Sequence, residues 1–296
     1  MHEDLPDLRI ADAGGPVHFR AWDGPAETTF VLVHGLGGSH LNWVQVAPGL
    51  SGLGRVLALD LPGFGTSPIA GRGTGLMDLR RSLAGFIESE ATGEVILAGN
   101  SMGGVLAVLQ AAVEPEHTHG LILTCSAFPR AKGALPSPLV MGAFAATDVP
   151  GLGDAVVTAR LRGLSPEQIV NIGLRVTMAD PGGLPDDVVR LHEDLVRIQR
   201  DLPDAPKAFV GAARSLLRLG RRPDVAHRAM DAVRCPVLVL HGRRDRLVPA
   251  RYAEVALAEH PSWRGRFFPD VGHVPQMEVP GRWLTEVSDW FSSTYG

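Results

Sequence analysis

Residues Glu94–Val113, EVILAGNSMGGVLAVLQAAV, carry the strongest structural signal in this 296-residue chain. This stretch begins as a short apolar run with β-branched residues and ends with apolar residues at helical spacing, and Gly99–Gly103 joins the two parts. The joint fits the pattern G-x-S-x-G, in which small residues let a strand turn sharply into a helix. Such a turn holds the hydroxyl of Ser101 exposed at the end of a strand, where a serine can act as a nucleophile.

Other short apolar runs recur on both sides of this stretch. Because most are continuously apolar, they favour strands buried on both faces of a parallel sheet. Val17–Trp22 alternates more and predicts an antiparallel edge strand. Helical patterns separate the runs, so the sequence predicts an α/β fold with a mostly parallel sheet flanked by helices. The predicted buried strands are Thr29–His34, Arg55–Leu59, Glu94–Gly99, Gly120–Cys125, Pro236–His241 and Arg264–Phe268, and the predicted helices are Leu76–Glu90, Met102–Val113, Ala250–Glu259 and Pro280–Ser293.

The alternation of strands and helices breaks between about Ala127 and Val233. This stretch has no convincing strand, its apolar residues fall at helical spacing, and its prolines divide it into short helices. The sequence therefore predicts a core domain made of residues 1–126 and 234–296. Residues 127–233 are predicted to form a helical cap, or lid, inserted between two strands of the core sheet.

Two residues after the insertion occur in the chain order that accompanies a G-x-S-x-G turn. The hydroxyl needs a base and the base needs an orienting acid, and in chain order the acid precedes the histidine. Asp245 lies just past the strand PVLVLHG, and His273 follows the next strand, 28 residues later. Both are expected at the carboxyl edge of the sheet with Ser101. Asp270 is a rival acid, but it lies only three residues before His273 and fits a turn better.

Two backbone N–H groups complete the predicted catalytic set. One donor to a developing oxyanion is expected from Met102, the residue after the nucleophile, and the other from the loop after an earlier strand. That loop is His34–Gly38, HGLGG, in which the Leu36 amide is the candidate donor. The glycines also have a plainer use, because they let the strand turn into the loop.

Five motifs together resemble the α/β-hydrolase fold superfamily, in its branch with a serine nucleophile: HGLGG, DLPGFGTS, GNSMGG, HGRRDRLVP and VGHVPQME. The resemblance covers Val17–Cys125 and Cys235–Trp290, and the helical insertion falls where that family places its cap. It implies a mostly parallel sheet of the eight-stranded type, with Ser101 as nucleophile, His273 as base and Asp245 as acid.

Three activities are compatible with this resemblance. Ser101 disfavours epoxide hydrolases and haloalkane dehalogenases, which use Asp at that position. What remains is acyl transfer to water by a carboxylesterase, lipase or thioesterase, and of these we expect a carboxylesterase-like enzyme. Its substrate would be a small-molecule carboxylic ester with a small to medium acyl chain, cleaved through an acyl-enzyme. The alternative is C–C hydrolysis of meta-ring-fission products, whose enzymes GNSMGG and GRRDRLVP also resemble. Those enzymes usually carry an aromatic residue after the catalytic histidine and a longer glycine-proline loop, whereas this chain has Val274 and HGLGG. The third possibility is that the protein is a non-catalytic ligand receptor with the same fold.

Residues that could contact the substrate are expected near the catalytic motifs and in the cap. Asn42 and Trp43 follow the oxyanion loop, although a tryptophan there is more often a core residue, and Val274 follows the catalytic histidine. In the cap, large apolar side chains could line an apolar pocket. The cap candidates are Met141, Phe144 and Phe209.

Composition and motifs limit the binding partners and the cellular location that we expect for the protein. With a net charge of −4 and a pI near 6.3, the chain offers no case for binding nucleic acid. We expect no metal and no cofactor, because C-x-x-C, GxGxxG and P-loop motifs do not occur. Met1–Arg9 lacks the apolar core of a signal peptide, and no apolar run approaches the roughly 18 residues of a membrane span. We therefore expect a soluble cytoplasmic protein, and no pattern favours a particular oligomeric state.

Overall fold

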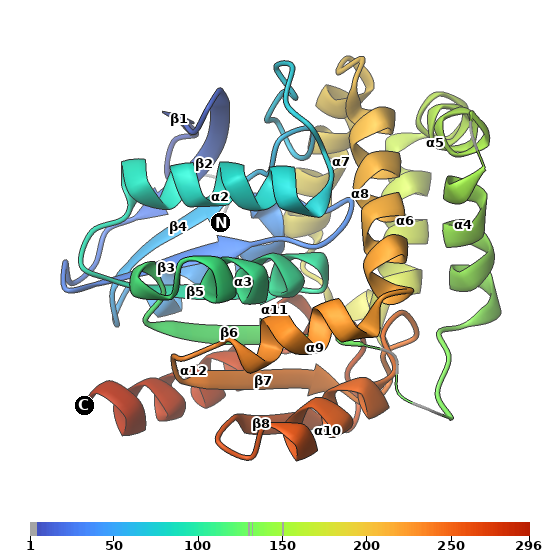
Figure 1. Cartoon of the computed structure of the whole chain (residues 1–296). Helices are drawn as coiled ribbons and strands as arrows, with labels where there is room; N and C mark the ends of the chain where they lie inside the picture. The colour runs from blue at the N-terminus through green and yellow to red at the C-terminus, as the bar shows by residue number, and fades with distance from the viewer. Residues whose placement is uncertain (1–4, 130, 132, 150) are drawn as a thin grey trace.

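One sheet organises the computed structural model, which describes residues 5–129, 131, 133–149 and 151–296 (Figure 1). Its eight described strands lie in the order β1-β2-β4-β3-β5-β6-β7-β8. The two pairings that involve β2 are antiparallel and the other five are parallel, which confirms the predicted mostly parallel sheet. The strands are β1 (Arg9–Asp12), β2 (Pro16–Trp22), β3 (Thr28–Val33), β4 (Arg55–Leu59), β5 (Glu94–Asn100), β6 (Gly120–Thr124), β7 (Val237–Gly242) and β8 (Arg264–Phe268).

The two edges of the sheet differ from the prediction. β2 was expected at the edge, but β1 pairs with it on the outside, with Ile10 opposite His18. β1 escaped prediction because it is short and mostly exposed, so only Ala11 in it is buried. β8 has the predicted bounds but is not buried on both faces, because it is the last strand and pairs only with β7.

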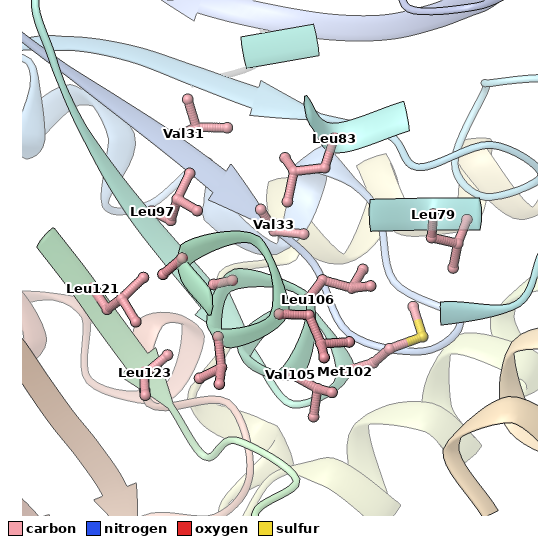
Figure 2. Packing of buried hydrophobic residues seen from close by; sticks show 14 of the residues in the cluster. Val31, Val33, Leu79, Leu83, Leu97, Met102, Val105, Leu106, Leu121 and Leu123 are labelled. Atoms are coloured by element: carbon pink, nitrogen blue, oxygen red, sulfur yellow. The ribbon is translucent and has the colours of Figure 1, made fainter. Parts of the chain in front are cut away.

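Alternating side chains of the central strands contribute to two separate cores, because successive residues of a strand point to opposite faces. On one face, Val31 and Val33 of β3 and Leu97 of β5 pack toward helices α2 and α3 (Figure 2). On the other face, Phe30 and Leu32 of β3 belong to a core with helices α1, α11 and α12. The flanking helices are α1 (Ala47–Leu50), α2 (Leu76–Glu90), α3 (Met102–Val113), α10 (Ala250–Glu259), α11 (Pro275–Glu278) and α12 (Pro280–Tyr295), with short 3-10 turns η1 (His40–Trp43) and η2 (Pro115–His117).

The chain between β6 and β7 forms helices and, among its described residues, no strand, as predicted for a helical insertion. Figure 1 shows α4 to α8 grouped at the end of the sheet toward which β7 points. Ala208 and Ala212 of α8 join the first core and Val188 of α7 joins the second, so the insertion shares both cores. Its elements are α4 (Pro138–Asp148), α5 (Leu152–Gly163), α6 (Pro166–Thr177), η3 (Pro181–Gly183), α7 (Asp186–Arg200), α8 (Ala205–Gly220) and α9 (Pro223–Asp231). Within the described residues, no helix combines the length and the apolar character needed to cross a membrane.

Candidate active site

Ser101 occupies a strained turn between β5 and α3. Its backbone has φ 54° and ψ −114°, a combination that non-glycine residues rarely adopt, and the residue is partly exposed. The flanking glycines allow a close backbone approach. A Cβ added to Gly99 would lie 2.3 Å from the Gly103 carbonyl oxygen, and one added to Gly103 would lie 2.1 Å from that of Val33. The G-x-S-x-G pattern therefore builds the sharp turn that the sequence predicts.

His273 and Asp245 form a hydrogen-bonded pair, with His273 Nδ1 and Asp245 Oδ2 2.6 Å apart. The residues are 5% and 9% exposed, respectively. The other carboxylate oxygen, Oδ1, accepts from the amides of Leu247 at 2.8 Å and Val248 at 2.9 Å. Burial by itself raises the pKa of Asp245, but the adjacent His273 and His241 outweigh burial and hold this pKa below its ordinary value. The carboxylate is therefore ionised and fixed on one side of the His273 ring.

Hydrogen bonds join the His273 loop to the Ser101 turn. Asn100, directly before the serine, donates from Nδ2 to the carbonyl oxygens of His273 at 3.0 Å and Thr124 at 3.1 Å. The Ser101 amide donates to the same Thr124 oxygen at 3.0 Å. Because β5, β6, β7 and β8 run parallel, the residues that follow them meet at one edge of the sheet. The structure thus brings Ser101, Asp245 and His273 to the same edge.

Asp270, the rival acid, lies at the surface. Its two carboxylate oxygens each accept from Arg282 Nη1 at 3.0 Å, and these hydrogen bonds lower the pKa of Asp270. The carboxylate at hydrogen-bonding distance from His273 Nδ1 belongs to Asp245.

The HGLGG loop packs directly against the Ser101 turn. A Cβ added to Gly35 would lie 3.1 Å from the Ser101 Cβ, so the loop passes the serine at close contact. His34 secures the loop: its Nε2 accepts from the Leu61 amide at 3.0 Å, and its Nδ1 donates to the Gly35 carbonyl oxygen at 2.7 Å. This ring therefore holds the loop rather than taking part in proton transfer.

The two predicted oxyanion donors flank this contact. Leu36 follows Gly35 directly, and its side chain is partly buried against the first core. The Met102 side chain is fully buried in the same core, and its amide belongs to the first turn of α3. Amides in the first turn of a helix have no acceptor within the helix, so such N–H groups are available to a ligand. Their role as oxyanion donors remains a prediction.

The cap residues predicted to contact substrate lie on two helices. Phe209 of α8 lies over the oxyanion loop, because a Cβ added to Gly37 would be 3.1 Å from its Cε2 atom. Met141 and Phe144 lie on α4, where Met141 is 39% exposed and Phe144 is partly exposed. Phe209 is thus the candidate that the structure places against the HGLGG loop.

Three other substrate candidates have different surroundings. Trp43 is fully buried, and its ring packs edge-to-face on Trp283 with centroids 6.0 Å apart. Val274 is 4% exposed and belongs to the same core. The structure places both in the core because the helices on that face of the sheet cover them. Asn42 is engaged within the protein: its Oδ1 accepts from the Ser39 amide at 2.8 Å, and its Nδ2 donates to Met277 Sδ at 3.2 Å.

Two groups that support the His273 loop were not predicted as part of the site. The His273 amide donates to the Thr177 carbonyl oxygen, at the end of cap helix α6, at 2.6 Å. Glu278 accepts from the amides of Gly272 and Ala179, both at 2.8 Å, and burial raises the pKa of this carboxyl. Thr177 acts through its backbone, which no side-chain pattern signals. Glu278 lies in the motif VGHVPQME, at the end of the short helix α11.

Cys125, His241 and Asp245 form a compact buried group, with one potential metal-ligand atom of each within 4.8 Å of the others. Burial raises the pKa of the Cys125 thiol well above its usual range, which opposes formation of the thiolate that binds metals. The Asp245 oxygen that faces His241, Oδ2, already accepts from His273 Nδ1 at 2.6 Å. These side chains are therefore better explained as internal support for the acid than as a metal site.

Comparison with known proteins finds relatives that match most of this chain. A 2-hydroxy-6-oxononadienedioate/2-hydroxy-6-oxononatrienedioate hydrolase from Cupriavidus pinatubonensis is 27% identical, over 86% of this chain and 83% of that protein. The dihydrolipoyllysine-residue acetyltransferase component of an acetoin cleaving system from Pseudomonas putida is 28% identical over 93% of this chain. The chain spans only 66% of the length of that relative.

Solved structures share the fold. An esterase from Thermogutta terrifontis, with malate bound, superposes with a TM-score of 0.68 at 24% identity, over 98% of this chain and all of that one. A family model described as the alpha/beta hydrolase family matches residues 30–287, well over half of the sequence. The chain therefore belongs to the alpha/beta hydrolase family.

Proposed function

We propose that this protein is a serine hydrolase that cleaves carboxylic esters with small to medium acyl chains through an acyl-enzyme. The observation that carries the proposal is the strained turn of Ser101, at the same sheet edge as the 2.6 Å pair of His273 and Asp245. A nucleophile, a base and an acid that orients the base are the groups that acyl transfer to water requires. Membership of the alpha/beta hydrolase family supports the same chemistry.

The proposed reaction begins with proton transfer from Ser101 to His273. Asp245 holds His273 Nδ1–H, which leaves Nε2 to take the Oγ proton while Oγ bonds to the ester carbonyl carbon. The carbonyl electron pair moves onto its oxygen, which the amides of Leu36 and Met102 would stabilise. When the C=O bond re-forms, the alcohol leaves with the proton from His273, and the acyl group stays on Ser101. Water then attacks the acyl carbon by the same route, releasing the acid and restoring Ser101.

The cap supports the proposed limit on acyl size. We propose that residues 127–233 act as the cap domain of a core made of residues 1–126 and 234–296. Phe209 of α8 lies against Gly37, two residues from the glycine that contacts Ser101, so a cap ring stands beside the proposed reaction centre. An aromatic wall there restricts the space for an acyl chain and favours apolar groups.

C–C hydrolysis of a ring-fission product is the second candidate. The observation in its favour is the relative from Cupriavidus pinatubonensis, which is 27% identical over 86% of this chain. Against it, the position after His273 holds Val274, a small aliphatic residue buried in the core, where the resemblance to those enzymes implies an aromatic one. Esters therefore remain the preferred substrates.

A substrate panel tests the proposal. Purified protein is assayed on p-nitrophenyl esters from acetate to laurate and on a ring-fission dienone, beside Ser101→Ala and the control Ser89→Ala, which changes an exposed serine of α2. We expect a burst with short and medium esters, and a loss of roughly 10³–10⁶-fold in kcat in Ser101→Ala only. Near-full activity of Ser101→Ala would contradict the nucleophile. Preference for the dienone would favour C–C hydrolysis, and inactivity on the whole panel would favour a ligand receptor.

A further inference from the structure

A second histidine, His241, lies against the Asp245 carboxylate. It belongs to β7 and is fully buried. Its Nε2 atom is 2.9 Å from the Val248 carbonyl oxygen and 3.4 Å from Asp245 Oδ2. The same Oδ2 interacts with His273 Nδ1 at 2.6 Å. One oxygen of the proposed catalytic acid therefore lies within reach of two imidazole rings.

The surroundings of His241 fix which nitrogen carries its proton. A carbonyl oxygen only accepts hydrogen bonds, so Nε2 must carry the proton and direct it toward Val248 and Asp245. Nδ1 is buried, and no group in the described part of the chain lies within hydrogen-bonding distance of it. A second proton on Nδ1 would be a buried donor without an acceptor, which is costly. The ring is therefore placed to donate from Nε2.

The other groups around His241 leave this donor role undisturbed. The Cys125 thiol lies in the same buried group, and its raised pKa keeps it uncharged. Phe267 of β8 lies beside the His241 ring, with centroids 6.4 Å apart. The Arg243 guanidinium lies over that phenyl ring, 4.6 Å from its centroid, and so does not meet the imidazole directly. The charged group that His241 contacts is the Asp245 carboxylate.

We propose that His241 is a positioning residue for the catalytic acid, which shares its Nε2–H between the Val248 carbonyl and Asp245 and so fixes the carboxylate toward His273. This inference rests on the proposed function, because it requires Asp245 to serve as the acid. The backbone amides hold only Oδ1, so the proposed His241 bond would restrain Oδ2 beside His273 itself, and the Cys125 thiol also interacts with this carboxylate. The bond also withdraws charge from the carboxylate. Without it, Oδ2 attracts protonated His273 more strongly.

Two substitutions separate a hydrogen-bond donor from a space filler. His241→Leu fills the position without a donor, whereas the side-chain amide of His241→Gln can place an N–H near the original Nε2. In the leucine variant, we expect the acid limb of kcat/KM to move about 0.5 unit to higher pH. We also expect kcat to fall about 10-fold, because the acid is misplaced, with KM nearly unchanged. The glutamine variant should restore most of both quantities.

A matched control accounts for general destabilisation. Thr29→Val, a fully buried position near the start of strand β3 and away from the carboxyl edge of the sheet, removes the hydrogen bond that Thr29 Oγ1 donates to the Thr92 carbonyl oxygen at 2.6 Å. It should lower Tm and leave the pH profile in place. If His241→Leu does not fold, His241→Met is the second apolar variant, and the comparison with glutamine is unchanged.

A readout without substrate keeps this inference separate from the proposed function. The proton between His273 Nδ1 and Asp245 should give a far-downfield ¹H NMR signal, because their hydrogen bond is short and charge-assisted. Loss of the His241 donor should move this signal and shift its pH response upward. An unmoved signal and acid limb, with Tm lowered as in Thr29→Val, would show that His241 only packs. A glutamine variant as impaired as the leucine variant would also overturn the donor role. If the signal responds but no ester is cleaved, only the proposed function fails.

Discussion

Replacing Asp245 with asparagine tests the assignment of the acid, because the structure fixes how the new amide must sit. Oδ1 accepts from the amides of Leu247 and Val248, so the asparagine carbonyl oxygen must occupy that position. The NH₂ group then falls where Oδ2 was, facing His273 Nδ1 across 2.6 Å. Two donors cannot face each other, so His273 must move its proton to Nε2. That nitrogen can then no longer accept the proton of Ser101.

We therefore expect Asp245→Asn to lower kcat on the order of 10⁴-fold, as loss of the correct tautomer does in other serine triads. The side chains are nearly the same size, so the fold should persist. The assay is p-nitrophenyl butyrate hydrolysis, with circular dichroism as the test of folding. Asp270→Asn is the matched control, because it breaks a surface ion pair with Arg282 and should cost less than tenfold. The reasoning fails if Asp245→Asn keeps more than a tenth of the activity or if Asp270→Asn loses more.

Three further outcomes follow from the same contacts. Gly103→Ala should destabilise the protein by about 3 kcal/mol or more in urea unfolding, because the new Cβ would meet a backbone oxygen at 2.1 Å. The control Gly142→Ala has open space around it and should be neutral or stabilising. The folded-state pKa of Asp245 lies below its unfolded value, so its ionisation stabilises the protein above about pH 4. The difference in unfolding free energy between wild type and Asp245→Asn should thus be constant from pH 7 to 5 and shrink below pH 4. Phe209→Ala should raise the kcat/KM ratio for hexanoate over acetate, and an unchanged ratio would contradict its place in the acyl pocket.

The sequence could predict those parts of the site in which a residue of a particular type comes directly after a strand. Ser101 carries a local signature, because the glycines around it are demanded by backbone atoms only 2–3 Å from where a Cβ would be. Asp245 and His273 each follow an apolar run, so their meeting at one edge follows from parallel topology. The short edge strand β1 lacked such a signal, since only Ala11 in it is buried.

The rest of the site depends on contacts between distant segments, and those leave little trace in one sequence. His241 resembles any histidine at a strand end until its Nε2 atom is seen 2.9 Å from the Val248 carbonyl oxygen and 3.4 Å from Asp245 Oδ2. Trp43 lies close in sequence to the oxyanion loop, yet it faces Trp283 in the core. Closeness in sequence to the oxyanion loop therefore did not place Trp43 beside Ser101, whereas the order of strands did place Asp245 and His273 at the same sheet edge as Ser101.

The contacts of the His273 loop indicate that the proposed cap, and not the sheet alone, holds the proposed base in place. A cap that only covered the site would alter substrate preference and leave the chemistry to the core. Instead, the Thr177 carbonyl at the end of α6 accepts from the His273 amide at 2.6 Å, and Glu278 ties the amides of Ala179 and Gly272 together. The proposed base is therefore held by the cap on one side and by Asp245 on the other. Movement of α6 would displace His273, so substitutions near this contact should change kcat, whereas those at the Phe209 wall should act mainly through acyl selectivity.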